Sequence, residues 1–262
     1  MRFCFHYLYF AAITFVAGFA SIGFAQTTAT AGYETIKFES ADGLPITGDL
    51  YLKHDKKAPF ILLCHQAGWS RGEYREIAPK LNKLGFNCLA IDQRSGKAIN
   101  GVANETVSAA KAAGKPTEFL DAEQDIVAAL KHVRKKYASG KLILWGSSYS
   151  SALALRIVGM NKGIADGVMS FAPGEYFVRF GKPEDFIKQG ASKLTVPVFI
   201  TSAKNEYPRW QEIFASIPSK SKSKFVPTTD GNHGSRALFE RFEDHGAYWK
   251  AVNAFLKPFL KS

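Results

Sequence analysis

Cysteine is scarce in this sequence, with only 3 among 262 residues. Cys4 lies in an apolar leader, whereas Cys64 and Cys88 each lie inside an apolar run that is typical of a strand. Side chains on neighbouring parallel strands rarely meet the geometry of a disulfide. We therefore expect two buried free thiols and no disulfide framework, and neither thiol has a nearby base that would make it a nucleophile.

Sequence patterns for metals and nucleotide cofactors are also missing. The 6 histidines show neither His-x-x-x-His spacing nor the combined spacing with cysteine that zinc sites use. No glycine-rich loop for a dinucleotide or a phosphate is present. The sequence therefore predicts a function that needs no metal and no cofactor.

Acidic residues are fewer than basic ones, 23 against 34, which gives a formal net charge of +11. The lysines are scattered along the chain and are not interleaved with aromatic residues on one element. This pattern does not favour nucleic-acid binding and indicates a solvated basic surface instead. A small molecule is the expected partner, and the sequence indicates no particular oligomeric state.

A long apolar run lies near the N-terminus. It follows Arg2 and extends from residue 8 to about residue 20, and small residues at Gly23 and Ala25 suit cleavage by signal peptidase. This predicts a signal peptide at residues 1–25, export to the periplasm or out of the cell, and no stable membrane insertion after cleavage. Because the run is shorter than a typical membrane span, an uncleaved anchor is the less favoured alternative.

Strand and helix patterns alternate after a short linker at residues 26–32. A turn sequence at residues 41–43 separates two strand patterns, which predicts a β-hairpin. Further strands are expected at residues 60–65, 86–92, 142–145, 167–171, 196–202 and 224–228. Helices are expected at residues 74–84, 118–137, 149–160, 210–217 and 236–260.

This alternation predicts one α/β domain over residues 33–262. The fold expected is a mostly parallel central sheet with helices on both faces and an N-terminal antiparallel hairpin. The longest stretch without a clear pattern is residues 94–115. Long irregular loops are usually functional or mobile, so we expect this stretch to line a pocket, with a disordered surface insertion as the alternative.

The segment around Ser148 carries the strongest chemical signal. An apolar strand, a sharp turn and an Ala/Leu-rich helix follow one another over residues 141–160. A serine at such a turn is strained and lifts its Oγ above the sheet, which requires small residues two positions before and after it. Gly146 and Ser150 meet this requirement around Ser148, whereas the preceding serine would have Trp145 two positions before it.

Residues 146–150, Gly-Ser-Ser-Tyr-Ser, resemble the nucleophile elbow of the α/β-hydrolase superfamily, Gly-x-Ser-x-Gly, with Ser150 in place of the last glycine. The resemblance spans about residues 33–260. The short segment between residues 171 and 196 looks closest to the dienelactone-hydrolase-like branch. That branch uses a cysteine nucleophile where this chain has Ser148, so its substrate is not carried over.

The resemblance implies two partners for the serine. The loop at residues 228–234 stands where the superfamily has its catalytic histidine, which makes His233 the expected general base. The acid that orients the histidine is expected after a strand that lies between the serine and the histidine. Glu206 occupies that place, and Glu175 after the preceding strand is the alternative.

Two backbone N–H groups are expected to bind the oxyanion. The first belongs to Tyr149, directly after the nucleophile. The second comes from residues 64–69, which resemble the superfamily's His-Gly-x-Gly loop; by position Ala67 is the donor, with Gln66 as the alternative. A further run, Asp-Gln-Arg-Ser-Gly at residues 92–96, resembles the superfamily's Asp-x-Arg-Gly-x-Gly segment, and we expect its arginine to fix the loop by pairing with a carboxylate.

Together these features predict a serine hydrolase that cleaves a carboxylic ester through an acyl-enzyme, with Ser148, His233 and Glu206 as the triad. A peptidase or an acyltransferase that uses the same residues is one alternative. A non-catalytic binding protein on the hydrolase fold is the other, because Ser150 and Gln66 stand where the family has glycines.

Overall fold

The computed structural model describes Met1 and residues 32–261 of the chain. The predicted signal peptide and nearly all of the predicted linker lie outside the described residues. Among the described residues, no helix combines the length and the hydropathy needed to cross a bilayer.

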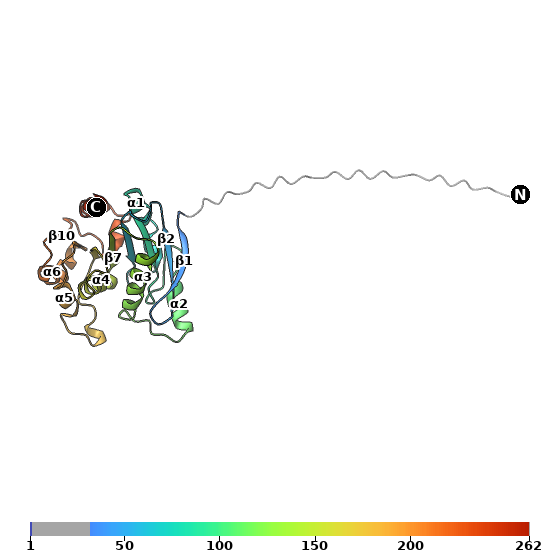
Figure 1. Cartoon of the computed structure of the whole chain (residues 1–262), viewed down its shortest axis with the longest axis horizontal. Coiled ribbons are helices and arrows are strands. Elements are labelled where there is room, and N and C mark those ends of the chain that lie inside the picture. The colour runs from blue at the N-terminus through green and yellow to red at the C-terminus, as the bar shows by residue number, and fades with distance from the viewer. Residues whose placement is uncertain (2–31, 262) are drawn as a thin grey trace. The chain divides into compact units, whose positions relative to one another are not determined.

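One eight-stranded sheet organises the domain, in the order β1-β2-β4-β3-β7-β8-β9-β10 (Figure 1). β2 pairs antiparallel with β1 and with β4, and the strands from β4 to β10 are parallel to one another. The strands are β1 (Glu34–Glu39), β2 (Pro45–Tyr51), β3 (Phe60–Cys64), β4 (Asn87–Ile91), β7 (Leu142–Ser147), β8 (Gly167–Phe171), β9 (Val198–Thr201) and β10 (Lys222–Phe225). This confirms the predicted hairpin followed by a parallel sheet.

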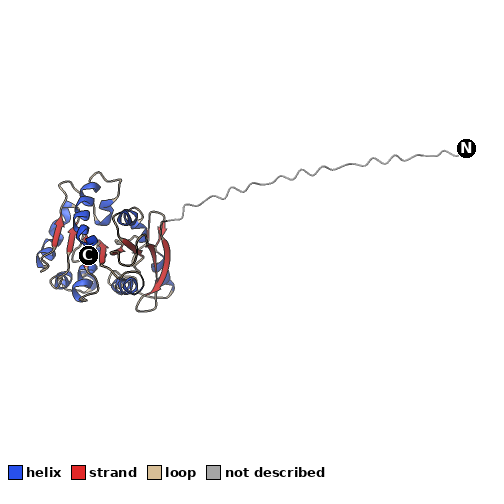
Figure 2. Cartoon of the chain, turned by 45° about the horizontal axis from the view of Figure 1, so that its top comes forward, coloured by secondary structure: helices blue, strands red, loops and turns tan. Residues whose placement is uncertain are grey.

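Helices cover both faces of the sheet (Figure 2). The α-helices are α1 (Ile77–Lys83), α2 (Glu105–Ala112), α3 (Ala122–Lys136), α4 (Tyr149–Met160), α5 (Phe186–Ala191), α6 (Tyr207–Ser216) and α7 (His245–Leu256). Short 3-10 turns are η1 (Arg71–Tyr74), η2 (Val178–Phe180), η3 (Lys204–Glu206), η4 (Gly234–Leu238) and η5 (Lys257–Lys261). The order agrees with the alternation of strand and helix patterns in the sequence.

Two apolar cores lie on opposite faces of the sheet. Successive side chains of a strand point to opposite faces, and in β7 Leu144 joins the core beneath α3 and α4 whereas Ile143 and Trp145 join the core beneath α1 and α7. The central strands are buried on both faces, which explains their continuous apolar runs. Cys64 and Cys88 lie in these strands as buried free thiols, as predicted.

The prediction of an irregular stretch at residues 94–115 is wrong. The segment forms a two-stranded hairpin, β5 (Ala98–Ile99) with β6 (Val102–Ala103), followed by α2. Asn100 and Gly101 both adopt positive φ, 51° and 72°, as the tight turn of a hairpin requires. Asn104 then caps α2 by accepting the Val107 N–H.

The C-terminal helix is also shorter than predicted. The expected helix at residues 236–260 is divided into η4, α7 and η5. Phe239 ends η4 in an extended conformation with ψ of 137°, and α7 begins only at His245. Pro258, which has no backbone N–H to donate, lies in the final 3-10 turn.

Arg94 has the structural role predicted for it. Its guanidinium is fully buried and binds Asp125 at 2.7 Å and Asp42 at 2.9 Å. Asp125 lies on α3 and Asp42 in the turn between β1 and β2, so Arg94 ties the N-terminal hairpin to the helix layer.

Candidate active site

Ser148 stands in a strained turn between β7 and α4. Its φ of 58° and ψ of −122° lie in a region that non-glycine residues seldom occupy, at a cost of about 1–3 kcal/mol. Two hydrogen bonds hold the turn: the Ser148 N–H donates to the Phe171 carbonyl at 2.7 Å, and the Ser151 hydroxyl donates to the Ser148 carbonyl at 2.6 Å. The strain is therefore supported from β8 and from the first turn of α4.

The small residues on either side of Ser148 allow this close turn. A Cβ atom on Gly146 would lie 2.4 Å from the Ser150 carbonyl oxygen. Ser150, at the place of the family's last glycine, uses its hydroxyl to bond the Cys64 carbonyl at 2.8 Å, and the same oxygen accepts the Ser147 N–H at 2.9 Å. The serine thus replaces glycine without opening the turn and adds a link to β3.

His233 and Glu206 lie in direct contact. His233 Nδ1 donates to Glu206 Oε1 at 2.5 Å, which leaves Nε2 as the other ring nitrogen. Glu206 follows β9 in η3, and His233 follows β10 in the loop before η4. Burial alone would raise the pKa of Glu206, but the hydrogen bond and charge of His233 together hold it below its usual value.

The loop that carries His233 packs on the turn that carries Ser148. The Ser235 N–H donates to Ser147 Oγ at 2.9 Å, and Gly234, with φ of 69°, approaches so closely that a Cβ there would lie 2.5 Å from the same oxygen. A residue with a side chain would not fit at Gly234. The histidine loop and the nucleophile turn are therefore held together through the residues adjacent to His233 and Ser148.

Tyr176 also lies beside Ser148. Its hydroxyl donates to the Ala172 carbonyl at 2.7 Å and interacts with the Ser148 side chain, and burial together with the nearby Glu206 charge raises the pKa of Tyr176 to about 12. Ala172 itself has a positive φ of 59°, which turns the chain after β8 toward the elbow. Tyr176 therefore remains a neutral phenol next to Ser148.

The predicted oxyanion donors, Ala67 and Tyr149, differ from the alternative, Gln66, in whether the backbone N–H is already hydrogen-bonded. Within the part of the chain that the structure describes, no acceptor binds the N–H of Ala67, and Tyr149 as the first residue of α4 has no acceptor in a preceding turn. The Gln66 N–H is already donated to Glu73 Oε2 at 2.8 Å. In this arrangement the Gln66 N–H is not available to a further acceptor, and Ala67 and Tyr149 remain the predicted donors.

Among the described residues, Glu175 makes its hydrogen bonds to α5 and none to His233. Its carboxylate accepts the N–H groups of Ile187 at 2.8 Å and Lys188 at 2.9 Å, which caps the start of α5. The structure therefore gives Glu175 a helix-capping role, and Glu206 is the carboxylate that meets the imidazole.

Glu73 is a buried residue that the sequence analysis did not single out. It lies in η1, has no exposed surface, and accepts the Ser147 hydroxyl at 2.7 Å in addition to the Gln66 N–H. Burial raises the pKa of Glu73 to about 7, against the lowering effect of its hydrogen bonds and of Arg236. No family motif marks this position, and its partners become visible only in three dimensions.

A hollow of about 440 Å³ opens beside Glu206 and His233. Its lining also includes Asn205, Asp230 and Arg236, and no residue of the 94–115 stretch contributes. The predicted role of that stretch in lining a pocket is therefore not supported at this hollow. Among the described residues, no group of three or more His, Cys, Asp or Glu side chains is arranged to hold a metal ion.

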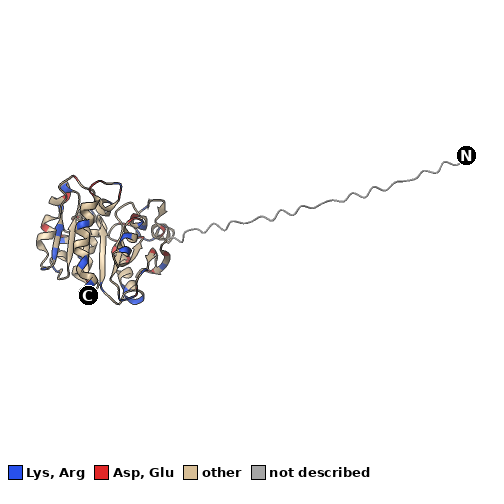
Figure 3. Ribbon diagram, turned by 90° about the horizontal axis from the view of Figure 1, so that it is seen from above, with Lys and Arg blue, Asp and Glu red and all other residues tan. Residues whose placement is uncertain are grey.

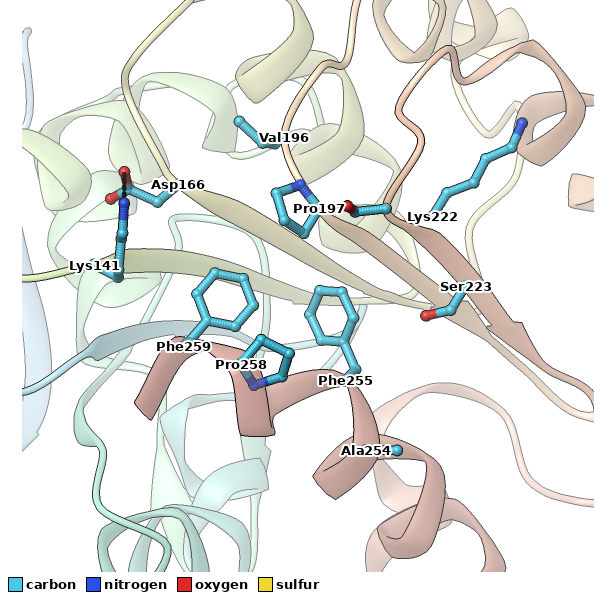
Figure 4. Close-up of a pocket in the computed structure, with 11 residues that line it drawn as sticks. Lys141, Asp166, Val196, Pro197, Lys222, Ser223, Ala254, Phe255, Pro258 and Phe259 are labelled. Atoms are coloured by element: carbon cyan, nitrogen blue, oxygen red, sulfur yellow. Dashed lines mark ion pairs between the residues drawn. The ribbon is translucent and has the colours of Figure 1, made fainter. Parts of the chain in front are cut away.

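A second cavity, of about 630 Å³, lies at the end of the sheet where the parallel strands begin (Figure 4). It is lined from the amino ends of the strands, whereas ligands of open α/β sheets bind outside the carboxyl ends. Its two lysines are engaged: Lys222 donates to the Ile217 carbonyl at 2.6 Å, and Lys141 lies 3.9 Å from Asp166.

Lys and Arg are spread over several elements elsewhere on the domain (Figure 3).

Known proteins share this fold with the chain. The sheet order, the strained serine turn and the histidine after the last strand are those of the α/β-hydrolase fold. Residues 55–179 match the family described as serine aminopeptidase, S33. The structural likenesses show the α/β-hydrolase fold, and the family match covers residues 55–179 within it.

Solved structures with this fold include several hydrolases. An esterase of Pyrococcus furiosus is 19% identical, with 87% of this chain and 93% of that chain covered and a TM-score of 0.67. A dienelactone hydrolase of Anabaena variabilis is 15% identical, with 87% and 99% covered and a TM-score of 0.66. An acylaminoacyl peptidase of Pyrococcus horikoshii is 14% identical, with 88% and 42% covered and a TM-score of 0.62. No curated protein matches the sequence.

Proposed function

We propose that this protein is a serine hydrolase that cleaves a carboxylic ester through an acyl-enzyme. The observation that carries the proposal is the 2.5 Å hydrogen bond between His233 and Glu206, in a loop that packs on the strained turn of Ser148. A carboxylate at this distance fixes the imidazole with its proton on Nδ1 and leaves Nε2 as a base. Similarity to an esterase and a dienelactone hydrolase supports the choice of an ester.

The chemistry assigned to each group follows from its position. Ser148 Oγ attacks the ester carbonyl while His233 Nε2 takes the hydroxyl proton, and the N–H groups of Ala67 and Tyr149 bind the oxyanion that forms. Collapse of the tetrahedral intermediate breaks the bond to the alcohol, which leaves with the proton from His233. Water then attacks the acyl-enzyme by the same route, and Glu206 stabilises the imidazolium in both halves without taking the proton.

Hydrolysis of p-nitrophenyl esters by the purified chain and by Ser148→Ala tests the proposal. We expect the substitution to lower kcat by more than about 10⁴-fold, because the nucleophile is lost. Glu175→Gln is the matched control, since Glu175 caps α5 and the described residues show no hydrogen bond between it and His233. Equal rates for the wild type and Ser148→Ala would refute the proposal.

A peptidase is the second candidate. The match to the serine aminopeptidase family and the likeness to an acylaminoacyl peptidase favour it. Such an enzyme uses the same acyl transfer but must protonate an amine, so aminoacyl p-nitroanilides would be cleaved at rates comparable to the esters. An acyltransferase would instead move the acyl group to an added alcohol in preference to water, and a non-catalytic binding protein would leave Ser148 unlabelled by a fluorophosphonate.

We place the enzyme in the periplasm or outside the cell. The basis is the predicted signal peptide at residues 1–25, with the alternative of an uncleaved anchor. The test is N-terminal sequencing of the protein recovered from periplasmic and extracellular fractions. A start near Gln26 supports export with cleavage, and an intact Met1 contradicts cleavage.

A further inference from the structure

Glu73 joins three segments of the proposed active site through hydrogen bonds. Glu73 Oε1 accepts the Ser147 hydroxyl at 2.7 Å, and Glu73 Oε2 accepts the Gln66 N–H at 2.8 Å. Ser147 Oγ in turn accepts the Ser235 N–H at 2.9 Å. The side chain of Glu73 is fully buried, so these bonds form without competition from bulk water.

Each of these contacts lies next to a group that the proposed reaction uses. Gln66 directly precedes Ala67, Ser147 directly precedes Ser148, and Ser235 follows His233 by two residues. The bond from the Gln66 N–H to Glu73 fixes the peptide unit between His65 and Gln66, one residue before the Ala67 N–H, which remains available. Because misplacement by about 1 Å can cost about 10²-fold in rate, a single residue that holds all three segments has leverage on the reaction.

The turn that carries Glu73 is itself firmly held. Ser70 caps η1, and Arg71 in η1 binds Asp49 at 3.0 Å and Asp92 at 2.5 Å. The Tyr74 hydroxyl donates to the Cys64 carbonyl at 2.7 Å, which attaches the end of the turn to β3. Glu73 is therefore anchored independently of the loops that it contacts.

We propose that Glu73 is a positioning residue of this active site, which holds the oxyanion loop, the nucleophile turn and the histidine loop in register with one another. The inference rests on the proposed function, because it assigns Glu73 a role in the acyl-transfer chemistry of that same site. Glu73 acts through Gln66, Ser147 and Ser235 and does not itself touch the substrate.

The charge environment supports a functional reason for an acid at this place. Arg236 is the cation near Glu73, and the ionisable groups Tyr74, Tyr149 and Cys64 also lie near its carboxylate. Burial raises the pKa of Glu73, so the carboxylate is costly to keep in the folded protein. An apolar residue of similar size would avoid this cost, but it would leave the Ser147 hydroxyl and the Gln66 N–H without an acceptor.

Two substitutions of Glu73 separate hydrogen bonding from packing. Glu73→Met keeps the length of the side chain but offers neither bond, and we expect kcat to fall about 10²-fold with KM changed less than about 3-fold. Glu73→Gln keeps an amide oxygen for the Gln66 N–H and an amide NH₂ for Ser147 Oγ, so it should recover a large part of the lost kcat. A cooperative thermal unfolding transition, measured on each variant, is the check that the variant is folded.

Ser147→Ala tests the same network if Glu73→Met does not fold. It removes the oxygen that links Glu73 to the histidine loop, and we expect kcat to fall about 10-fold with little change in KM. Glu175→Gln, in which a carboxylate outside this network is changed, is the control and should retain wild-type kcat. The assay is p-nitrophenyl ester hydrolysis together with the rate of fluorophosphonate labelling at Ser148.

The outcomes distinguish this inference from the proposed function. Low kcat and slow labelling in Glu73→Met or Ser147→Ala, with recovery in Glu73→Gln, would support the positioning role. The positioning role would be overturned if folded Glu73→Met had wild-type kcat and labelling. It would also be overturned if Ser147→Ala and Glu73→Gln both had wild-type kcat and labelling. Either result would leave the proposed hydrolase function standing. A wild-type protein that neither hydrolyses esters nor reacts with the fluorophosphonate would refute the proposed function and, with it, the role of Glu73.

Discussion

Replacement of Glu206 by glutamine is the sharpest test of the proposed chemistry. The substitution removes the negative charge that lies 2.5 Å from His233 Nδ1 and can present an amide NH₂ there, which favours the wrong tautomer. In a fully buried triad such a change lowers kcat by about 10⁴-fold. Because the His233 side chain is 28% exposed, water compensates in part, and we expect about 10³-fold, or about 4 kcal/mol of transition-state stabilisation.

The assay is the pH dependence of p-nitrophenyl ester hydrolysis by the wild type, Glu206→Gln and Glu175→Gln. The pKa of Glu206 is held below its usual value, so its carboxylate is ionised throughout the neutral range and the loss should be similar at every pH tested there. Glu175→Gln should remain within about 3-fold of the wild type, because the hydrogen bonds of Glu175 go to the N–H groups at the start of α5. A Glu206→Gln variant as active as the wild type, or a larger loss in Glu175→Gln, would refute the assignment of the acid.

Three further predictions concern buried groups. Arg94→Met leaves Asp125 buried without its partner and should cost about 3–5 kcal/mol, which lowers Tm by about 6–20 °C in a thermal melt; an unchanged Tm would contradict the structural role of Arg94. Burial raises the pKa of the Cys64 and Cys88 thiols, so iodoacetamide should modify neither in the native protein and both after unfolding in urea, as read by mass spectrometry. Burial raises the pKa of the Glu73 carboxyl from 4.5 to about 7, so the folded protein binds the carboxyl proton more tightly than the unfolded chain does. As pH rises from 4.5 to 7, Glu73 therefore lowers the free energy of unfolding by up to about 3 kcal/mol. The Tm of the wild type should therefore decrease relative to Glu73→Gln between pH 5 and pH 8, and parallel curves would contradict this.

The parts of the fold that the sequence predicted are those that local physics determines. β3, β4 and β7 are buried on both faces, so their apolar runs are visible without knowledge of their neighbours. The serine turn was predictable for the same reason, because the requirement for a small residue at Gly146 is set by atoms only four residues away. Residues 94–115 gave no such signal, since strands of two residues are too short to show a period.

The site was predictable in part, for a different reason. The order of serine, acid and histidine along the chain, together with the resemblance to a family, selected Glu206 and His233, and the structure joins them by a hydrogen bond; their catalytic roles stay predictions. Glu73 was missed because its two partners lie 7 and 74 residues away and belong to no common motif. The choice between Ala67 and Gln66 likewise depended on where a single N–H points, which no residue pattern encodes.

The outer edge of the sheet at β10 has a consequence for how the protein behaves at high concentration. This strand is only four residues long and carries Lys222 and Lys224, and among the described residues no strand pairs with its far side. Positive charges on a short terminal strand discourage the addition of a strand from another molecule. Replacing both lysines with threonine would remove these charges and leave this short strand more open to such pairing.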